Sequence, residues 1–208
     1  MTEWLFAPAF TLWGSPTTWL EIAAFGLALG MVACNIRTVI WGWPLAMASS
    51  LLYGALFWRS KLYGEAALQV FFVLLAGWGW RQWLRGQRHA YGSLPQVPPQ
   101  TLRIARLPAA NITKLIAASA VFILATGLFL SKFTDSDVPW ADAVPTALSV
   151  VGTWLLGRKY LENWLVWGVV NSISVGLFAY KGLWLTAALY ALLLVLSWVG
   201  WRAWQRQL

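Results

Sequence analysis

Two segments of the sequence match without a gap: LYGEAALQVFFVLLAGWGWRQW, residues 62–83, and LWLTAALYALLLVLSWVGWRAW, residues 183–204. Both contain Ala-Ala-Leu near the start and end in Gly-Trp-Arg followed by another Trp, and a shift of 121 residues superposes them. Each is predominantly apolar over about 20 residues, the length that an α-helix needs to cross the hydrocarbon core of a bilayer. The sequence therefore predicts one apolar helix that occurs twice in the fold.

The same shift continues to match residues towards the N-terminus. It places Trp19 on Trp140, Arg37 on Arg158, and Trp43 on Trp164. A single Trp match means little in a chain with 17 Trp, but a gapless register over three consecutive apolar runs is hard to obtain by chance. The pattern indicates two three-helix repeats.

The composition agrees with a membrane protein. Of 208 residues, 60% are hydrophobic and 11% charged, with a mean hydropathy of +0.62, whereas charged residues make up about a quarter of a soluble domain. We therefore predict an all-α polytopic membrane protein with seven transmembrane helices. The predicted spans are residues 18–36, 39–58, 62–84, 112–131, 139–157, 161–180 and 183–204.

The odd number of helices has a topological consequence. Two three-helix units joined directly would lie in opposite senses across the bilayer, and one extra crossing restores the same sense. The repeats are then parallel, in a 3+1+3 arrangement that is one of the known designs of secondary transporters. We predict a first repeat over residues 1–84, a basic Pro-rich cytoplasmic linker plus connector helix over 85–131, and a second repeat over 132–208.

The distribution of Lys and Arg predicts the orientation. With the N-terminus outside and the C-terminus in the cytoplasm, most basic residues fall inside, including those of the linker, which we expect to be solvated. Only Arg59, Lys61, Lys132 and Lys181 fall outside. This topology explains the net charge of +8 better than a nucleic-acid partner does.

The sequence argues against an enzyme. There is no GxxxxGK[ST] loop for ATP phosphates, and His89 and Cys34 are the only residues of their types, so no His or Cys metal cluster and no catalytic triad can be assembled. We expect no metal and no cofactor. Few acidic residues lie within the spans, which favours passive facilitated diffusion over proton-coupled transport.

Polar and aromatic residues inside the spans are the candidates for a substrate site, because a polar group in hydrocarbon needs a partner. The repeat register pairs Ser50 with Asn171 and Gln69 with Tyr190, so equivalent positions carry different polar groups, as an asymmetric ligand would require. The candidate residues are Ser50, Tyr53, Glu65, Gln69, Trp164, Trp167, Asn171, Trp184 and Tyr190.

Each candidate also has a structural interpretation. Asn171 could hydrogen-bond a neighbouring helix, and Glu65 could pair with Lys61. Trp164 could be an interfacial anchor, which makes Trp167 the better residue for stacking on a planar ligand. Trp residues near span ends are typical of interfacial aromatic belts; they include Trp19, Trp80, Trp83, Trp140, Trp201 and Trp204.

The third span contains Leu68-Gln69 followed by GWxxW, and the sixth contains WxxWxxxN from Trp164 to Asn171. With the segment 164–204, these features resemble the PnuC family of bacterial vitamin transporters. The resemblance implies uptake of nicotinamide riboside by a homotrimer in the bacterial inner membrane, with an architecture akin to SWEET sugar transporters and a cytoplasmic kinase that traps the substrate. It also implies that Gln69 holds polar edges of the substrate, while Trp167 stacks on it and Asn171 hydrogen-bonds it.

Two alternatives remain open from the sequence. Relatives in the same family carry thiamine or riboflavin in the same frame. From a different class, the chain could be a membrane scaffold whose basic linker recruits a partner or anionic lipid, with the buried polar groups serving helix packing alone.

Overall fold

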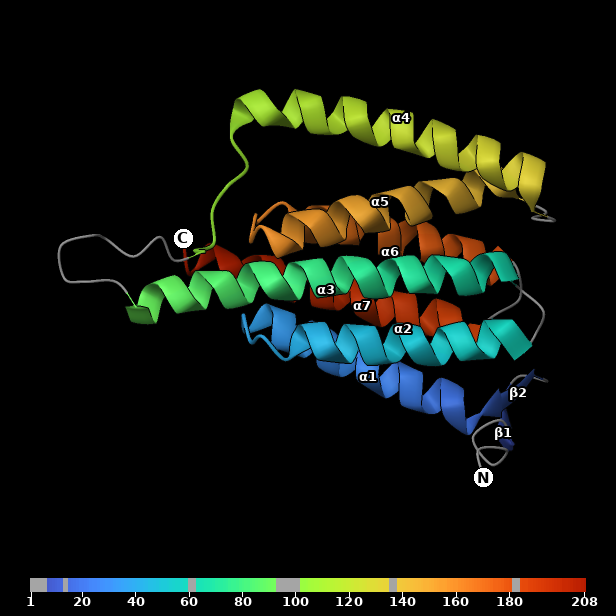
Figure 1. Cartoon of the computed structure of the whole chain (residues 1–208). Helices are drawn as coiled ribbons and strands as arrows, with labels where there is room; N and C mark the ends of the chain where they lie inside the picture. The colour runs from blue at the N-terminus through green and yellow to red at the C-terminus, as the bar shows by residue number, and fades with distance from the viewer. Residues whose placement is uncertain (1–6, 13–14, 60–62, 93–101, 135–137, 181–183) are drawn as a thin grey trace. The chain divides into compact units, whose positions relative to one another are not determined.

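The computed structural model describes residues 7–12, 15–59, 63–92, 102–134, 138–180 and 184–208. Over these residues the chain forms seven α-helices and one short β-hairpin (Figure 1). The chain divides into two compact units, Met1–Gly77 and Trp78–Leu208. The prediction of seven helices is confirmed for the described residues. The hairpin is an addition that the hydrophobic pattern did not predict.

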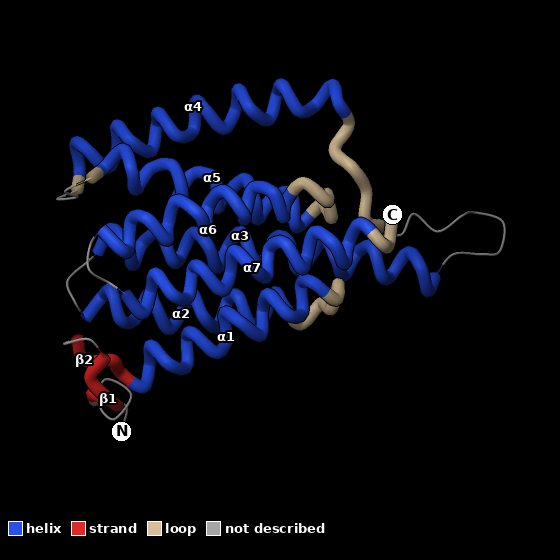
Figure 2. Tube along the Cα trace, turned by 180° about the vertical axis from the view of Figure 1, so that it is seen from behind, coloured by secondary structure: helices blue, strands red, loops and turns tan. Residues whose placement is uncertain are grey.

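The hairpin precedes the first helix. Strands β1 (Pro8–Leu12) and β2 (Ser15–Thr18) pair antiparallel, directly before α1 (Trp19–Ile36), as Figure 2 shows in red. Pro16 and the neighbouring threonines disfavour a helix at this point, because proline lacks the amide proton and β-branched residues favour strands. The first helix therefore begins only at Trp19.

Helix α2 (Gly42–Arg59) packs against α1 within the first unit. Leu20 and Ala24 of α1 are buried, and the Ser49 hydroxyl of α2 donates a hydrogen bond of 3.2 Å to the Ala24 carbonyl oxygen. A small residue at Ala24 lets the two helices approach, and the hydroxyl then finds an acceptor in the apolar contact.

The second unit contains the end of α3 and four further helices. Helix α5 packs between α4 and α6, and α6 packs between α5 and α7. The helix bounds are α3 Tyr63–Gly92, α4 Ala109–Phe133, α5 Pro139–Gly157, α6 Asn163–Tyr180 and α7 Trp184–Gln205.

Glycines opposite indole rings allow these helices to pack closely. A Cβ at Gly157 would lie 2.5 Å from the Trp78 ring, and a Cβ at Gly200 would lie 2.5 Å from the Trp164 ring. Gly127 meets Trp140 in the same way. The chain has 17 Gly and 17 Trp, and small residues at helix interfaces are what lets large neighbours fit between backbones.

Helix α4 exposes most of its apolar side chains. By length and hydropathy, Ala109–Phe133 and Ala187–Gln205 are the two described helices that meet a criterion for crossing a membrane. Exposed apolar surface on this scale is unfavourable in water and favourable in lipid. The exposed large residues of α4 are Ile112, Ile116, Val121, Phe122, Leu124, Leu128, Phe129 and Phe133.

The helix bounds follow the repeat register. A shift of 121 residues turns α2, Gly42–Arg59, into residues 163–180, which are the bounds of α6, and turns the first residue of α3, Tyr63, into Trp184, the first residue of α7. The bounds of α1 and α5 agree to within one residue under the same shift.

The loops that follow α1 and α5 have the same backbone structure. Thr38 and Lys159, which correspond in the register, both have φ 56°. The amide of Val39 donates to Cys34 O at 2.8 Å, and that of Tyr160 donates to Leu155 O at 3.0 Å. Each helix thus ends in a left-handed residue with a Schellman-type hydrogen bond, although neither position is glycine.

The linker is partly packed, which corrects the prediction of a solvated segment. Helix α3 continues to Gly92, past the predicted end at residue 84, because no proline interrupts residues 85–92. Beyond the undescribed residues 93–101, Ala105 forms a parallel bridge with Tyr160, and the Leu107 amide donates to Glu162 Oε2 at 2.8 Å. Leu107 is buried, so apolar residues of the linker attach it to the loop between α5 and α6.

Lys159 lies in that loop. Its Nζ lies 4.6 Å from the centroid of the Trp83 ring, a cation–π contact. Burial lowers the pKa of Lys159 below the ordinary value of 10.5, because desolvation disfavours the ammonium form.

Two tryptophans assigned to the interfacial belts are buried. Trp204 is 0% exposed, and Trp83 is buried with its Nε1 donating to Leu156 O at 3.2 Å. Trp19 and Trp140 are exposed near helix starts, as an interfacial position requires. The belt interpretation is therefore wrong for Trp83 and Trp204, because proximity to a helix end does not determine which way a side chain points.

Candidate functional site

Three predicted site residues of α6, Trp164, Trp167 and Asn171, contact two different neighbouring helices. Trp164 is 4% exposed and packs edge-to-face on Trp204 of α7, with ring centroids 5.6 Å apart. Trp164 is therefore packed in the α6–α7 contact rather than placed as an interfacial anchor, and it also lines the pocket described below. Its Nε1 is buried and donates to no acceptor among the described residues.

Asn171 also points to α7. It is 3% exposed, and its Nδ2 donates a hydrogen bond of 3.0 Å to Ser197 Oγ. The Ser197 hydroxyl in turn donates to Leu193 O at 2.8 Å. Asn171 Oδ1 is buried and accepts no hydrogen bond from the described residues, a state that costs about 1–3 kcal/mol when no donor arrives.

Trp167 points to α5 instead. It is half-buried, and its Nε1 lies 3.2 Å from the position that a Cβ would take at Gly152. The spacing of three and four residues does place Trp164, Trp167 and Asn171 on one broad side of α6. The structure joins Trp164 and Asn171 through their contacts with α7, and it does not join Trp167 to either.

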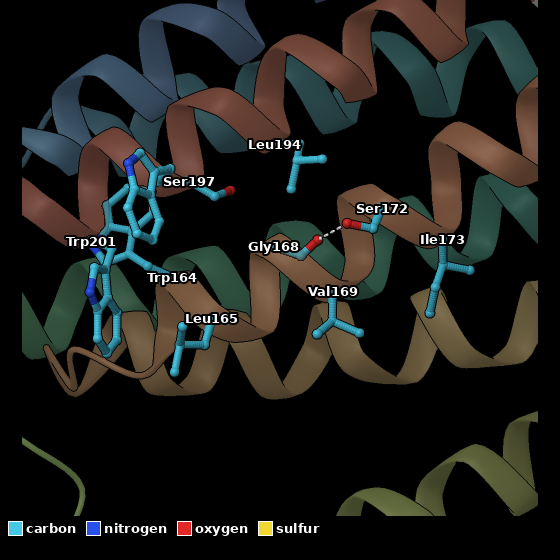
Figure 3. Close-up of a pocket in the computed structure, with 10 residues that line it drawn as sticks. Trp164, Leu165, Gly168, Val169, Ser172, Ile173, Leu194, Ser197 and Trp201 are labelled. Atoms are coloured by element: carbon cyan, nitrogen blue, oxygen red, sulfur yellow. Dashed lines mark hydrogen bonds between the residues drawn. The ribbon is translucent and has the colours of Figure 1, made fainter.

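A pocket of about 330 Å³ lies between α6 and α7 (Figure 3). Leu165, Val169 and Ile173 recur every four residues along α6, on the side away from Trp167, and the first two are exposed. Trp164 is the one sequence-predicted site residue in its wall. The pocket is lined by Trp164, Leu165, Gly168, Val169, Ser172, Ile173, Leu194, Ser197, Trp198 and Trp201.

The polar groups of this pocket are serine hydroxyls. Ser172 donates to Gly168 O at 2.8 Å, which Figure 3 marks with a dashed line, and is exposed. Ser197 is buried and belongs both to the pocket wall and to the hydrogen bond with Asn171. The pocket is otherwise apolar, so it suits an apolar group better than a polar nucleoside.

In the first unit, the predicted residues lie on α2 and α3. Ser50 and Tyr53 of α2 and Gln69 of α3 are half-buried. The Gln69 Cβ lies 3.4 Å from the position of a Cβ at Gly54, an ordinary contact, so α2 and α3 meet at Gln69. Ser50 and Gln69 therefore both lie on helices that are in contact at this level.

The remaining predicted residues differ in what the structure describes. Tyr190 of α7 is half-buried and stacks on Phe178 of α6, with centroids 5.1 Å apart and an interplanar angle of 15°. Glu65 lies in α3 and Trp184 begins α7, but the side chains of both are outside the described residues.

Ser197 is the residue that sequence reasoning missed. It corresponds in the repeat register to Ala76, so the two halves carry an apolar and a polar residue there, whereas Ser50 and Asn171 are two different polar residues. A search of the register for all such differences would have found it. Its contact with Asn171, 26 residues away, is not visible in a local pattern.

No group of three His, Cys, Asp or Glu that could hold a metal ion exists among the described residues. The described arrangement offers amide, hydroxyl and indole groups, which bind by hydrogen bonding and stacking.

Comparison with known proteins gives consistent matches. The family model described as Nicotinamide mononucleotide transporter matches residues 18–206. The nicotinamide riboside transporter PnuC of Escherichia coli K12 is 28% identical over 209 residues, covering 92% of this chain and 87% of that protein. The riboflavin/roseoflavin transporter RibM of Streptomyces davaonensis is 29% identical over 204 residues, covering 97% of this chain and 92% of that protein.

The fold also matches a solved structure. A crystal structure of the vitamin B3 transporter PnuC superposes with a TM-score of 0.70 at 24% identity, covering 91% of this chain and 81% of that one. The match over residues 18–206 includes all seven described helices, and the chain therefore belongs to the nicotinamide mononucleotide transporter family, the family of the PnuC proteins.

Proposed function

We propose that the protein is a membrane transporter that imports nicotinamide riboside by facilitated diffusion. Membership of the family and the likeness to PnuC of Escherichia coli support transport of a vitamin or its nucleoside precursor. The observation that carries the proposal in this chain is Asn171, an amide that is 3% exposed on an apolar helix and has one acceptor unfilled by the described residues. Such a group is costly unless a ligand or partner completes its hydrogen bonds.

The substrate contacts are assigned residue by residue. Asn171 would accept a hydrogen bond from the substrate, Trp167 would stack on its ring, and Gln69 would hold its polar edges. The assignment of both repeats to one substrate rests on the sequence register and on the resemblance. The other proposed contacts are Ser50, Tyr53, Glu65, Trp164, Trp184 and Tyr190.

The transport mechanism follows from the repeat. We propose two parallel three-helix repeats, α1–α3 and α5–α7, with α4 as connector, in a SWEET-like arrangement that opens the site to each side in turn. Two observations support this repeat. The bounds of α2 and α6 coincide under the shift of 121 residues, and Thr38 and Lys159 have the same φ of 56°. The domain limits proposed are 1–84, 85–131 and 132–208.

The cellular setting completes the proposal. The protein would be a homotrimer in the bacterial inner membrane, with its N-terminus outside and its C-terminus in the cytoplasm, in keeping with the positive-inside rule. A cytoplasmic kinase would phosphorylate the imported nucleoside, and this trapping would make passive uptake effective without ion coupling.

Riboflavin is the second candidate substrate. RibM is as similar to this chain as PnuC of Escherichia coli is, and the two chains cover each other over 97% and 92% of their lengths. A flavin ring would use the same kinds of contact, stacking and hydrogen bonds. Thiamine remains an alternative from the resemblance.

A binding panel on purified protein tests the proposal. Calorimetry with nicotinamide riboside, riboflavin and thiamine should give saturable binding of nicotinamide riboside, weakened by Asn171→Ala. Ser149→Ala is the matched control, because it removes a helical hydroxyl that bonds only to Pro145 O among the described residues. Failure of all three compounds to bind would refute the proposed function.

Transport is tested in proteoliposomes. Labelled nicotinamide riboside should enter until its inside and outside concentrations are equal. Uptake above that level under an imposed proton or sodium gradient would refute facilitated diffusion, while leaving the substrate assignment intact.

A further inference from the structure

The Ser197 hydroxyl donates its single proton within its own helix. A serine hydroxyl has one donor and can accept further hydrogen bonds. The Ser197 proton goes to Leu193 O, four residues earlier on α7, at 2.8 Å, a bond that serines within helices commonly make. While that bond is made, Ser197 Oγ can act towards α6 only as an acceptor.

An acceptor at this position fixes the orientation of Asn171. The amide group of Asn171 can present either NH₂ or oxygen to Ser197, and only NH₂ can donate to Oγ, as the 3.0 Å bond from Nδ2 requires. With a flipped amide, the Ser197 hydroxyl would have to turn away from Leu193 O to donate to Asn171 Oδ1, so one hydrogen bond would replace two. The orientation that keeps both bonds points Oδ1 away from Ser197, and there it accepts no hydrogen bond from any described residue.

The pair belongs to the second repeat alone. In the register, Asn171 corresponds to Ser50 and Ser197 corresponds to Ala76, which is buried. The first repeat therefore has the same backbone elements without the amide and without the acceptor that orients it.

From these contacts we infer that Ser197 is a positioning residue that makes the substrate site select ligands offering an N–H or O–H donor over isosteres that lack it. The inference rests on the proposed function, in which Asn171 contacts the substrate. A carboxamide, such as that of nicotinamide, supplies such a donor, and so does the imide N–H of a flavin. A site with a fixed acceptor rejects the analogue without a donor, because the buried oxygen is then left unpaired.

The test compares two ligands of nearly equal shape. Nicotinamide riboside has an amide NH₂, and 3-acetylpyridine riboside has a methyl group in its place, with the same positive ring and the same carbonyl. Calorimetry on the purified full-length protein gives the ratio of their dissociation constants. Wild-type protein should prefer nicotinamide riboside by roughly 5- to 100-fold, the effect of one buried unpaired acceptor.

Variants at Ser197 separate orientation from folding. Ser197→Ala removes the acceptor, so that Asn171 can turn its carbonyl away from the ligand and offer NH₂ to the ligand instead. The preference for nicotinamide riboside over 3-acetylpyridine riboside should then fall at least about 5-fold. Ser197→Thr retains a hydroxyl that bonds the same carbonyl, and should restore the preference. Ser149→Ala, which removes a hydroxyl of α5 that bonds only to Pro145 O among the described residues, should leave it unchanged. The ratio compares two ligands on the same variant, so a general loss of stability cancels.

Each outcome has a distinct meaning. An unchanged ratio in Ser197→Ala, together with weaker binding in Asn171→Ala, would overturn the role of Ser197 and leave the proposed function standing. Unchanged binding in Asn171→Ala would overturn the assignment of Asn171 to the substrate and the inference with it. Should riboflavin prove to be the bound compound, riboflavin and its N3-methyl analogue provide the same comparison.

Discussion

Replacing Gly200 with alanine is expected to destabilise the contact between α6 and α7. A Cβ at this position would lie 2.5 Å from Cε2 of Trp164 and 2.6 Å from its Cδ2 and Cε3. These atoms belong to a rigid ring that is itself buried and packed edge-to-face on Trp204, whose side chain is 0% exposed. The ring therefore cannot yield without displacing a second buried indole.

The magnitude is the difference of two opposing effects. Overpacking of a close-packed contact costs about 1–3 kcal/mol, whereas Gly→Ala in a helix interior gains about 1 kcal/mol. Three ring atoms would lie within 2.6 Å of the new methyl group, which places the cost in the upper half of that range. We expect a net loss of about 1–2 kcal/mol, or about 2–8 °C in Tm for a chain of this size.

Gly168→Ala is the matched control. Gly168 lies on α6 in the pocket wall, and a Cβ there would meet nothing within 4 Å. Only the helix propensity then changes, so this variant should keep or slightly raise the Tm. The assay is thermal unfolding of detergent-purified protein, followed by the loss of monodisperse elution on size exclusion. The reasoning would be refuted if Gly200→Ala unfolded at the same temperature as Gly168→Ala.

Three further predictions concern the loops. Thr38→Gly should raise stability by about 1 kcal/mol, because Thr38 has φ 56° and a β-branched residue is strained there; a lower Tm would contradict this. Glu162→Gln should weaken the 2.8 Å hydrogen bond from the Leu107 amide, because a bond to a charged acceptor is worth about 1 kcal/mol more than one to a neutral acceptor. The rate of amide hydrogen exchange at Leu107 should rise about fivefold, and an unchanged rate would count against the linker contact. Burial lowers the pKa of Lys159 below 10.5 in the folded protein, so protonation of Lys159 lowers the free energy of unfolding at neutral pH. That free energy should rise again as the pH rises through the folded pKa towards 10.5. Lys159→Met should lack this rise between pH 7 and 10, and parallel Tm curves for the two proteins would argue against a buried ammonium.

The hydrophobic pattern was sufficient to place the helices. Apolar runs of about 20 residues are determined by the chain itself, because a helix satisfies its own backbone hydrogen bonds. The predicted spans 39–58 and 161–180 begin two or three residues before α2 (Gly42–Arg59) and α6 (Asn163–Tyr180), whose bounds are related by the shift of 121 residues. The polar continuation of α3 to Gly92 was missed, because hydropathy marks the limit of an apolar run and not the end of a helix.

The direction of individual side chains was decided by tertiary structure alone. The sequence placed Trp164 and Trp204 among residues near helix ends, but Trp164 packs against Gly200 and Trp204, and both indoles are buried. It identified Asn171 as a candidate but could not supply its hydrogen bond with Ser197, because a contact between residues 26 positions apart depends on which faces of α6 and α7 meet. Local periodicity determines that a face exists, while the opposing helix determines which atoms of that face remain available to a ligand.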